Sequence, residues 1–202
     1  MGIGTIAALL DALARDADAA GRPHPTVVLD EAYTEFAGRS LADLRAEYPR
    51  LVVLRTMSKA YSIAGLRVGF AVARPEIIEE IAVYRPPGSV SNVSVDVAAA
   101  LLSDPALAPS RVAAIAAERE RFSRALRDAG WAPQPSTTNF LLVAFPSTSA
   151  AEAAAEGLLS RGIIPRTFPA DHPLAHCLRL TVRNAEQDDR LVDAAREIGS
   201  GA

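Results

Sequence analysis

Two short apolar runs, joined by a segment with helical character, constrain the fold of this chain more than any other feature. Residues 26–29 (TVVL) and residues 51–55 (LVVLR) are hydrophobic almost throughout, and such runs are typical of buried parallel strands. Residues 41–48 between them are predicted to form a short helix, and two parallel strands need a crossover of this kind. The start of the chain is therefore predicted to be an α/β structure built on a parallel sheet.

The remaining hydrophobic periodicity divides the chain into two parts at the break RPPGS, residues 85–89. The first part is predicted to contain a third strand over residues 66–73 and helices over residues 6–20 and 77–84. The second part is predicted to begin with an alanine-rich helical stretch, which is interrupted around residues 105–110 and ends at 128–130. Strands are predicted over residues 139–145, 163–164 and 178–182. Helices are predicted over residues 150–160, with Ser149 as N-cap, and over residues 186–198. The second part is therefore predicted to be a small α/β layer of sheet and helices.

The composition argues against several kinds of partner. The formal net charge of −3 over 202 residues provides no basic excess to offset nucleic-acid phosphates. No apolar run is long enough to span a bilayer, no targeting signal is recognisable, and no metal site is predicted, so a cytoplasmic protein is expected. The single cysteine, Cys177, cannot form an internal disulfide and is expected to be a small buried residue beside a strand.

Polar residues gather where the predicted strands meet the loops. Asp30 ends the first apolar run in the sequence DEAY, Lys59 follows the second in TMSK, and Arg67 lies at the start of the third in AGLRVG. Ligand sites of parallel sheets lie at the carboxyl ends of the strands. Taken singly, a strand-terminal aspartate is usually a turn residue, and a lysine or an arginine is usually a solvated surface charge. The order and spacing of all three favour a shared ligand site.

Taken together, these motifs resemble the core signature of the class I/II (fold-type I) aminotransferases, which use pyridoxal 5′-phosphate (PLP), and they are most similar to the histidinol-phosphate aminotransferase family. The similarity runs from about Thr26 to the end of the chain. It implies the PLP-dependent transferase fold, here a partial three-layer α/β sandwich with a parallel sheet. Residues 1–85 are expected to be the remainder of the large PLP-binding domain, and residues 86–202 a connecting helix and a small C-terminal α/β domain.

The resemblance also implies roles for the residues of the three motifs. Lys59 would bond covalently to the cofactor and move the substrate proton, which requires a nucleophilic amine. Asp30 would pair with the pyridinium nitrogen and keep it protonated, and Tyr33 would donate a hydrogen bond to the phenolic oxygen. Three residues would contact the cofactor phosphate: Thr56, Ser58 and Arg67.

Two arginines of the second part are implied to bind the substrate. Arg166 and Arg179 resemble family arginines that reach the substrate's anionic group, a task that suits the planar guanidinium fork. An ordinary surface position remains an alternative for Arg166, whereas Arg179 lies within an apolar strand, where a charge needs a partner. Arg183 stands where many relatives have glycine. Gly88 and Ser89 stand where the relatives continue with an aromatic residue. Both differences affect the expected substrate more than the expected reaction.

The implied activity is transfer of an amino group between an amino acid, or histidinol phosphate, and a 2-oxo acid. A PLP-dependent decarboxylase of an amino-acid phosphate is an alternative, and carbon dioxide release against oxo-acid formation would separate the two. A catalytically inactive remnant that acts as a binding or dimerisation module is another. Family members carry a long segment before the DEAY strand that is absent here, so the chain is expected to form a homodimer or to pair with a missing N-terminal half, because a parallel sheet cut short exposes an apolar edge.

Overall fold

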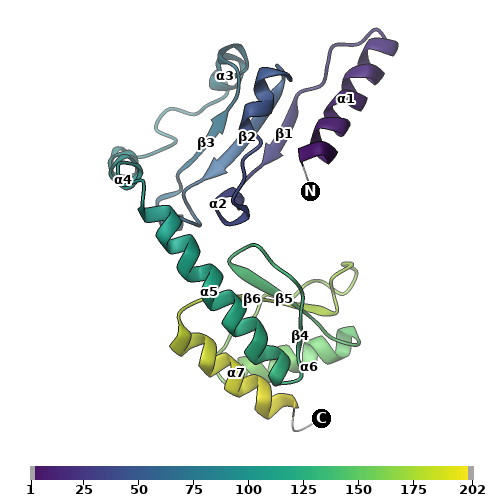
Figure 1. Ribbon diagram of the computed structural model, residues 1–202, viewed down its shortest axis with the longest axis vertical. Helices are drawn as coiled ribbons and strands as arrows, with labels where there is room; N and C mark the ends of the chain where they lie inside the picture. Colours follow the sequence, from purple (N-terminus) through teal and green to yellow (C-terminus); the bar gives the residue numbers. More distant parts are fainter. Residues whose placement is uncertain (1–2, 200–202) are drawn as a thin grey trace. The chain divides into compact units, whose positions relative to one another are not determined.

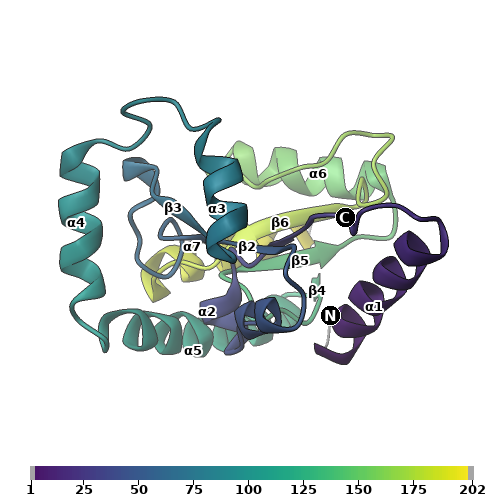
Figure 2. The same cartoon turned by 90° about the horizontal axis from the view of Figure 1, so that it is seen from above.

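The computed structural model describes residues 3–199, and the chain divides into two compact units, residues 1–109 and 110–202. The boundary predicted at residues 85/86 lies in the irregular connection between helices α3 and α4, which Figure 2 shows as a long loop. The assignment of residues 1–85 and 86–202 to a large and a small domain stays a prediction.

The first unit is built on a three-stranded sheet with the strand order β1-β2-β3 (Figure 1). Its helices and strands, including the 3₁₀ turns η1 and η2, are α1 (Ile3–Ala19), β1 (Val27–Asp30), α2 (Thr34–Ala37), η1 (Ala42–Ala46), β2 (Leu51–Thr56), η2 (Ala64–Leu66), β3 (Gly69–Val72), α3 (Pro75–Ala82) and α4 (Asn92–Leu102).

The predicted parallel pair is confirmed, with Val27 opposite Leu51 and Asp30 opposite Leu54. The third strand differs from the prediction, because β3 pairs with β2 in the antiparallel direction. The chain returns from β2 through the turn η2 without a helix that crosses the sheet, so β3 runs back along its neighbour. The strand is also shorter than predicted, since Arg67 has a left-handed backbone with φ of 55° and ends the turn before it.

One face of the first sheet is covered and the other is partly open. Leu51 and Val53 pack against Ile6 and Leu10 of α1, and all four side chains are buried. On the opposite face Val28 is 58% exposed. The prediction that residues 26–29 are buried throughout was therefore wrong, because within the described chain only one side of β1 lies against the core.

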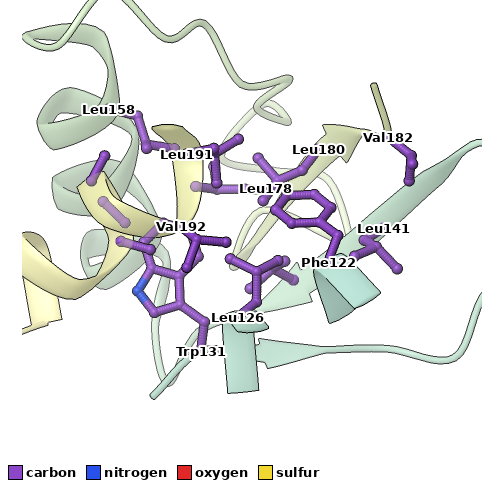
Figure 3. Close-up of a cluster of buried hydrophobic side chains, with 14 residues drawn as sticks. Phe122, Leu126, Trp131, Leu141, Leu158, Leu178, Leu180, Val182, Leu191 and Val192 are labelled. Atoms are coloured by element: carbon purple, nitrogen blue, oxygen red, sulfur yellow. The ribbon is translucent and has the colours of Figure 1, made fainter. Parts of the chain in front are cut away.

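The second unit is a three-stranded antiparallel sheet, in the order β4-β5-β6, whose helices lie on one face (Figure 1). Its elements are α5 (Leu107–Asp128), β4 (Ala132–Pro133), β5 (Phe140–Ala144), α6 (Thr148–Leu159), β6 (Cys177–Thr181) and α7 (Ala185–Gly199). Figure 3 shows the core, where Phe122, Leu158 and Val192 from three different helices meet the strand residues Leu141 and Leu178. Burying this apolar surface is the main stabilising contribution to the unit.

Several local predictions for the chain needed correction. The helix predicted at residues 41–48 is the 3₁₀ turn η1, and residues 163–164 lie outside the described strands. The N-cap of α6 is Ser147, whose hydroxyl oxygen accepts a hydrogen bond from Ala150 N at 3.1 Å, instead of Ser149. Cys177 is buried at the start of β6 as predicted, and burial raises the pKa of its thiol. No described helix is both long and apolar enough to cross a membrane.

Candidate active site

Three of the predicted site residues lie at or just beyond the carboxyl ends of the parallel strands β1 and β2. Asp30 is the last residue of β1 and faces Leu54, while Thr56 ends β2 two residues further on. Because side chains alternate between the two faces along a strand, Asp30, Leu54 and Thr56 project from the same face of the sheet. Lys59 follows in the loop after β2. The register therefore gathers a carboxylate and a hydroxyl on one side of this edge.

Asp30 is exposed, and its backbone is held in a local turn. Its Oδ1 accepts a hydrogen bond from Ala32 N at 2.9 Å, which fixes the carboxylate relative to the chain that leaves the strand. Glu31 N donates to Leu54 O at 2.9 Å and extends the pairing of the two strands beyond Asp30. The carboxylate position is thus set by main-chain contacts on both sides.

Glu31 plays a structural part that its place in the DEAY motif did not reveal. Its side chain is buried, and its carboxylate accepts hydrogen bonds from the Ser40 hydroxyl at 2.8 Å and from Leu41 N. These bonds tie the segment after α2 to the end of β1. A buried carboxylate with two donors is well compensated, so Glu31 supports the turn that carries Asp30.

Lys59 and Tyr33 meet in space although they lie on different loops. The Nζ atom of Lys59 lies 5.7 Å from the centroid of the Tyr33 ring, within the range in which the ring face attracts a cation. The Tyr33 ring is also in tilted contact with Phe36, with 6.3 Å between the ring centroids. Lys59 is the single lysine of the whole sequence, so the Tyr33 ring borders the chain's sole side-chain amine.

Thr56 and Ser58 form a compact hydroxyl pair just before Lys59. Thr56 Oγ1 donates to Ser58 Oγ at 2.9 Å and accepts from Ser58 N at 3.1 Å. Between them the side chain of Met57 is buried, and its N atom donates to Val68 O at 3.1 Å. The loop that carries Lys59 is therefore anchored in the core on one side and presents hydroxyl groups on the other.

Arg67 lies across from this loop on the chain that enters β3. Its side chain is exposed, and Nη1 donates to Ala64 O at 3.0 Å. Ser62 and Arg67 are the non-glycine residues with positive φ among residues 3–199, at 60° and 55°. Such backbone conformations are costly for L-residues and cluster at functional sites. Among the described residues, the side-chain hydrogen bonds of Thr56 and Ser58 do not involve Arg67.

An ion pair that the sequence did not suggest supports the same region. Arg55 Nη2 lies 2.7 Å from Glu35 Oε1, and both side chains are largely buried. The pair links the end of β2 to α2, the short helix that directly follows Tyr33. Partial burial makes such a pair sensitive to the loss of either partner.

Arg166 and Arg179 of the second unit form an isolated antiparallel β-bridge, so they lie opposite each other. Arg166 N donates to Arg179 O at 3.1 Å, and Arg179 N donates to Arg166 O at 2.9 Å. Both side chains are exposed, and the guanidinium carbon of Arg179 lies 5.0 Å from the centroid of the Phe140 ring. Arg179 thus projects from the helix-free face of the sheet, where the Phe140 ring lies beside its guanidinium group.

The two arginines line a hollow of about 660 Å³, here called the arginine groove, whose lining residues lie within 162–167, 179–183 and 187–191. Asp188 is buried in the wall of this groove, and both of its carboxyl oxygens accept from Arg183 N, at 3.1 and 3.2 Å. Burial, and the neighbouring Glu118 carboxylate to a smaller degree, raise the pKa of Asp188 to about 7. Sequence reasoning missed this residue, because a polar position in an amphipathic helix predicts a solvated side chain.

Known proteins share sequence and fold with this chain. The family described as "Aminotransferase class I and II" matches residues 10–194. A histidinol-phosphate aminotransferase of Thermoanaerobacter pseudethanolicus is 40% identical over 173 residues, which cover 85% of this chain and 48% of that protein. The chain spans about half the length of the curated relatives it matches.

Solved structures show the same partial coverage. The crystal structure of histidinol-phosphate aminotransferase from Sinorhizobium meliloti in complex with pyridoxal-5′-phosphate is 31% identical, with a TM-score of 0.80, over 94% of this chain and 53% of that one. A decarboxylase from Sulfurospirillum multivorans has a TM-score of 0.81 at 23% identity over 100% of this chain and 52% of that one, a likeness of fold alone. The predicted fold class is confirmed by these similarities.

Proposed function

Since this chain belongs to the family of class I and II aminotransferases, we propose that it carries the cofactor lysine and the substrate-binding arginines of a PLP-dependent transaminase. The observation that supports this most directly is the position of Lys59. Its amine borders the Tyr33 ring and directly follows the Thr56–Ser58 hydroxyl pair, at the edge of the sheet where Asp30 presents its carboxylate. Ligands of α/β sheets bind at this edge.

The residues present fit PLP by their chemistry. PLP, when bound, supplies an electron sink for the bond that breaks at the substrate's α-carbon. The Lys59 amine is proposed to hold the cofactor covalently and, once released, to accept and return the α-proton. Asp30, whose carboxylate is exposed and has one oxygen bonded to Ala32 N, would keep the ring nitrogen protonated, and the Tyr33 hydroxyl would donate to the phenolic oxygen. Three side chains would hold the phosphate: Thr56, Ser58 and Arg67.

The substrates are proposed to be an amino donor, either an amino acid or histidinol phosphate, and a 2-oxo acid. Arg166 and Arg179 would bind an anionic group of the donor or acceptor. Both guanidinium groups are exposed and have no carboxylate partner among residues 3–199, which supports this role. The decarboxylase from Sulfurospirillum multivorans shares the fold at too low an identity to support carbon dioxide release as a second activity.

We also propose that the first sheet packs against further polypeptide, either in a homodimer or from an N-terminal half of the kind that the relatives possess, in a cytoplasmic enzyme. Val28 and Leu54 project from the same face and are 58% and 40% exposed, and β1 and β3 are edge strands of the described sheet. Exposed apolar side chains beside open strand edges are typical of surfaces that a partner covers.

The test is to incubate the purified chain with PLP, reduce it with borohydride, and map the modified residue by mass spectrometry. The sequence makes this assay unusually clean, because the only amines are the Lys59 side chain and the chain's N-terminus. A near-stoichiometric adduct on Lys59 is expected. An adduct confined to the N-terminus, or none, would refute the proposal that Lys59 of this chain holds the cofactor.

A further inference from the structure

Helix α2 begins directly after Tyr33 and has little stability of its own. It comprises four residues, Thr34–Ala37, and Tyr33 occupies the N-cap position without a side-chain capping hydrogen bond. A single turn of helix is marginal in water, because fixing its backbone costs more free energy than its few hydrogen bonds contribute. The position of α2, and with it the place of the Tyr33 ring, therefore depends on contacts with the rest of the first unit.

The ion pair between Glu35 and Arg55 ties α2 to the neighbouring strand. Arg55 Nη2 donates to Glu35 Oε1 at 2.7 Å, although the two residues lie 20 positions apart in the sequence. The side-chain hydrogen bonds of Glu31 and Thr34, in contrast, stay within residues 31–41. The Glu35–Arg55 pair is thus a direct link between α2 and the end of β2.

Stability alone does not account for this ion pair. The side chains of Arg55 and Glu35 are 23% and 13% exposed, and the atoms Arg55 Nε and Glu35 Oε2 are buried without a hydrogen-bond partner among residues 3–199. A buried ion pair with polar atoms left unpaired adds little net stability compared with apolar side chains of similar volume. It does hold its two side chains together, because separating them leaves each charge buried and unpaired. The pair is therefore suited to fixing α2 in place.

The ion pair joins the two segments whose side chains meet at the proposed cofactor site. Glu35 lies two residues after Tyr33, and Arg55 lies four residues before Lys59. The buried Met57 side chain anchors the loop between Arg55 and Lys59 in the core. The Lys59 amine lies 5.7 Å from the centroid of the Tyr33 ring, so a shift of α2 relative to β2 would move the ring away from the amine.

We propose that Glu35 and Arg55 are positioning residues, whose ion pair holds the Tyr33 ring against the Lys59 amine. The pair acts through α2 on one side and through the loop after β2 on the other. Its meaning for catalysis rests on the proposed function, in which the Tyr33 hydroxyl and the Lys59 amine act on the same cofactor. Loss of the pair should then displace the ring while the core of the first unit stays folded.

NMR of the full chain labelled with ε-¹³C-lysine tests this proposal, because the sequence contains a single lysine and gives a single labelled side-chain signal. The ring current of Tyr33 is expected to shift the Lys59 signal upfield of its position in the Tyr33→Leu variant, which lacks the ring. The double variant Glu35→Met with Arg55→Met removes both charges, so no unpaired charge is left buried. Its Lys59 signal should move most of the way to the Tyr33→Leu position, while its thermal melting stays close to that of the parent chain.

Two further variants separate the ion pair from general disturbance. The charge-swapped chain, Glu35→Arg with Arg55→Glu, restores an ion pair and should bring the Lys59 signal back toward the parent position. The matched control replaces Asp16 and Arg22 with methionine. These residues form an exposed ion pair of the first unit at 2.7 Å, and its loss should leave the Lys59 signal unchanged.

A parent-like Lys59 signal in the Glu35→Met, Arg55→Met chain would overturn the proposal, as would equal signals in the parent and Tyr33→Leu chains. A folded charge-swapped chain whose signal stays displaced would also overturn it, because packing and not the charge pair would then place the ring. Loss of the folded state in both double variants of the Glu35–Arg55 pair would make the pair a stability element and contradict the inference as well.

The borohydride assay at Lys59 reports separately on the proposed function. A Lys59 adduct in the parent chain, together with an unmoved NMR signal in the Glu35→Met, Arg55→Met chain, would sink the inference alone. A missing adduct with the expected NMR changes would sink the transaminase proposal alone.

Discussion

Asp188 on α7 holds the backbone of Arg183, because both of its carboxyl oxygens accept from Arg183 N, at 3.1 and 3.2 Å. Arg121 lowers the pKa of Glu118, to which it donates at 2.7 Å, whereas burial raises the pKa of Asp188 to about 7. The neighbouring Glu118 carboxylate adds to the effect of burial on the pKa of Asp188. Asp188 is therefore an acid that titrates near neutral pH in the wall of the arginine groove.

Asp188 makes the stability of the second unit depend on pH. The pKa of Asp188 is near its usual value of 3.8 in the unfolded chain and about 7 in the folded chain, so between these values the folded state binds one proton more. The free energy of unfolding should then fall as pH rises, by about 1 kcal/mol per pH unit between pH 5 and pH 7. The lowered pKa of Glu118 makes the free energy of unfolding rise with pH, but only at pH values below the usual pKa of 4.5.

Urea denaturation followed by the fluorescence of Trp131, the single tryptophan and a residue of the second unit's core, would measure this dependence. Asp188→Asn removes the titrating group and should flatten the curve between pH 5 and pH 8. Asp193→Asn is the control, since Asp193 is an exposed residue of the same helix. A slope that persists in Asp188→Asn would assign it to another group.

The proposed function predicts that replacing Lys59 abolishes amino transfer. Lys59→Arg keeps a cation near the Tyr33 ring but cannot bond covalently to the cofactor aldehyde, so it separates the loss of charge from the loss of the nucleophile. Both Lys59→Ala and Lys59→Arg should lack side-chain adducts after borohydride reduction and show no turnover in an oxo-acid assay. Parent-like turnover in either variant would contradict the assignment of Lys59.

The charge of Asp30 should matter for turnover more than for folding. Asp30→Asn retains an oxygen that can accept from Ala32 N, so the turn should survive and some PLP should still bind. Turnover should fall on the order of 10²-fold or more, as when a preorganised electrostatic contact is removed from an active site. Asp43→Asn, at a fully exposed side chain, is the comparison variant and should be unchanged. Equal losses in both variants would argue against a specific role for Asp30.

Glu31 should contribute to stability and not to chemistry. Glu31→Ala leaves Leu41 N and the Ser40 hydroxyl without their acceptor, which should lower the free energy of unfolding by about 1–3 kcal/mol. Thermal melts monitored by circular dichroism would show this loss. Glu47→Ala, at an exposed position, should melt like the parent chain, and an equally small shift for Glu31→Ala would mean that its two hydrogen bonds contribute little.

The sequence predicted the framework of the site better than its surroundings. The apolar runs that became β1 and β2 were recognisable because strand burial leaves a direct trace in composition, and Asp30 and Lys59 stand where those runs end. The reversal of β3 was not predictable, because its direction depends on how the turn at Arg67 folds and not on the apolar pattern. The roles of the site residues themselves stay predictions.

Contacts between segments that are distant in the sequence were even harder to predict from the sequence. Asp188 and Glu118 each stand in a helix whose pattern predicts a solvated face, and only the packing of α5 against α7 makes one of them a buried acid. The same holds for Glu35 and Arg55, which meet because α2 folds back beside the end of β2. Side chains that act through long-range contacts are set by tertiary structure, which a local pattern does not encode.

The bridge between Arg166 and Arg179 is made by main-chain atoms on both sides. The spacing of these two positions therefore does not depend on which side chains occupy them. Evolution, or an engineer, can exchange either residue and change the charge and shape of the groove without disturbing the scaffold that presents it. Single substitutions at either position can therefore give the groove new substrate preferences.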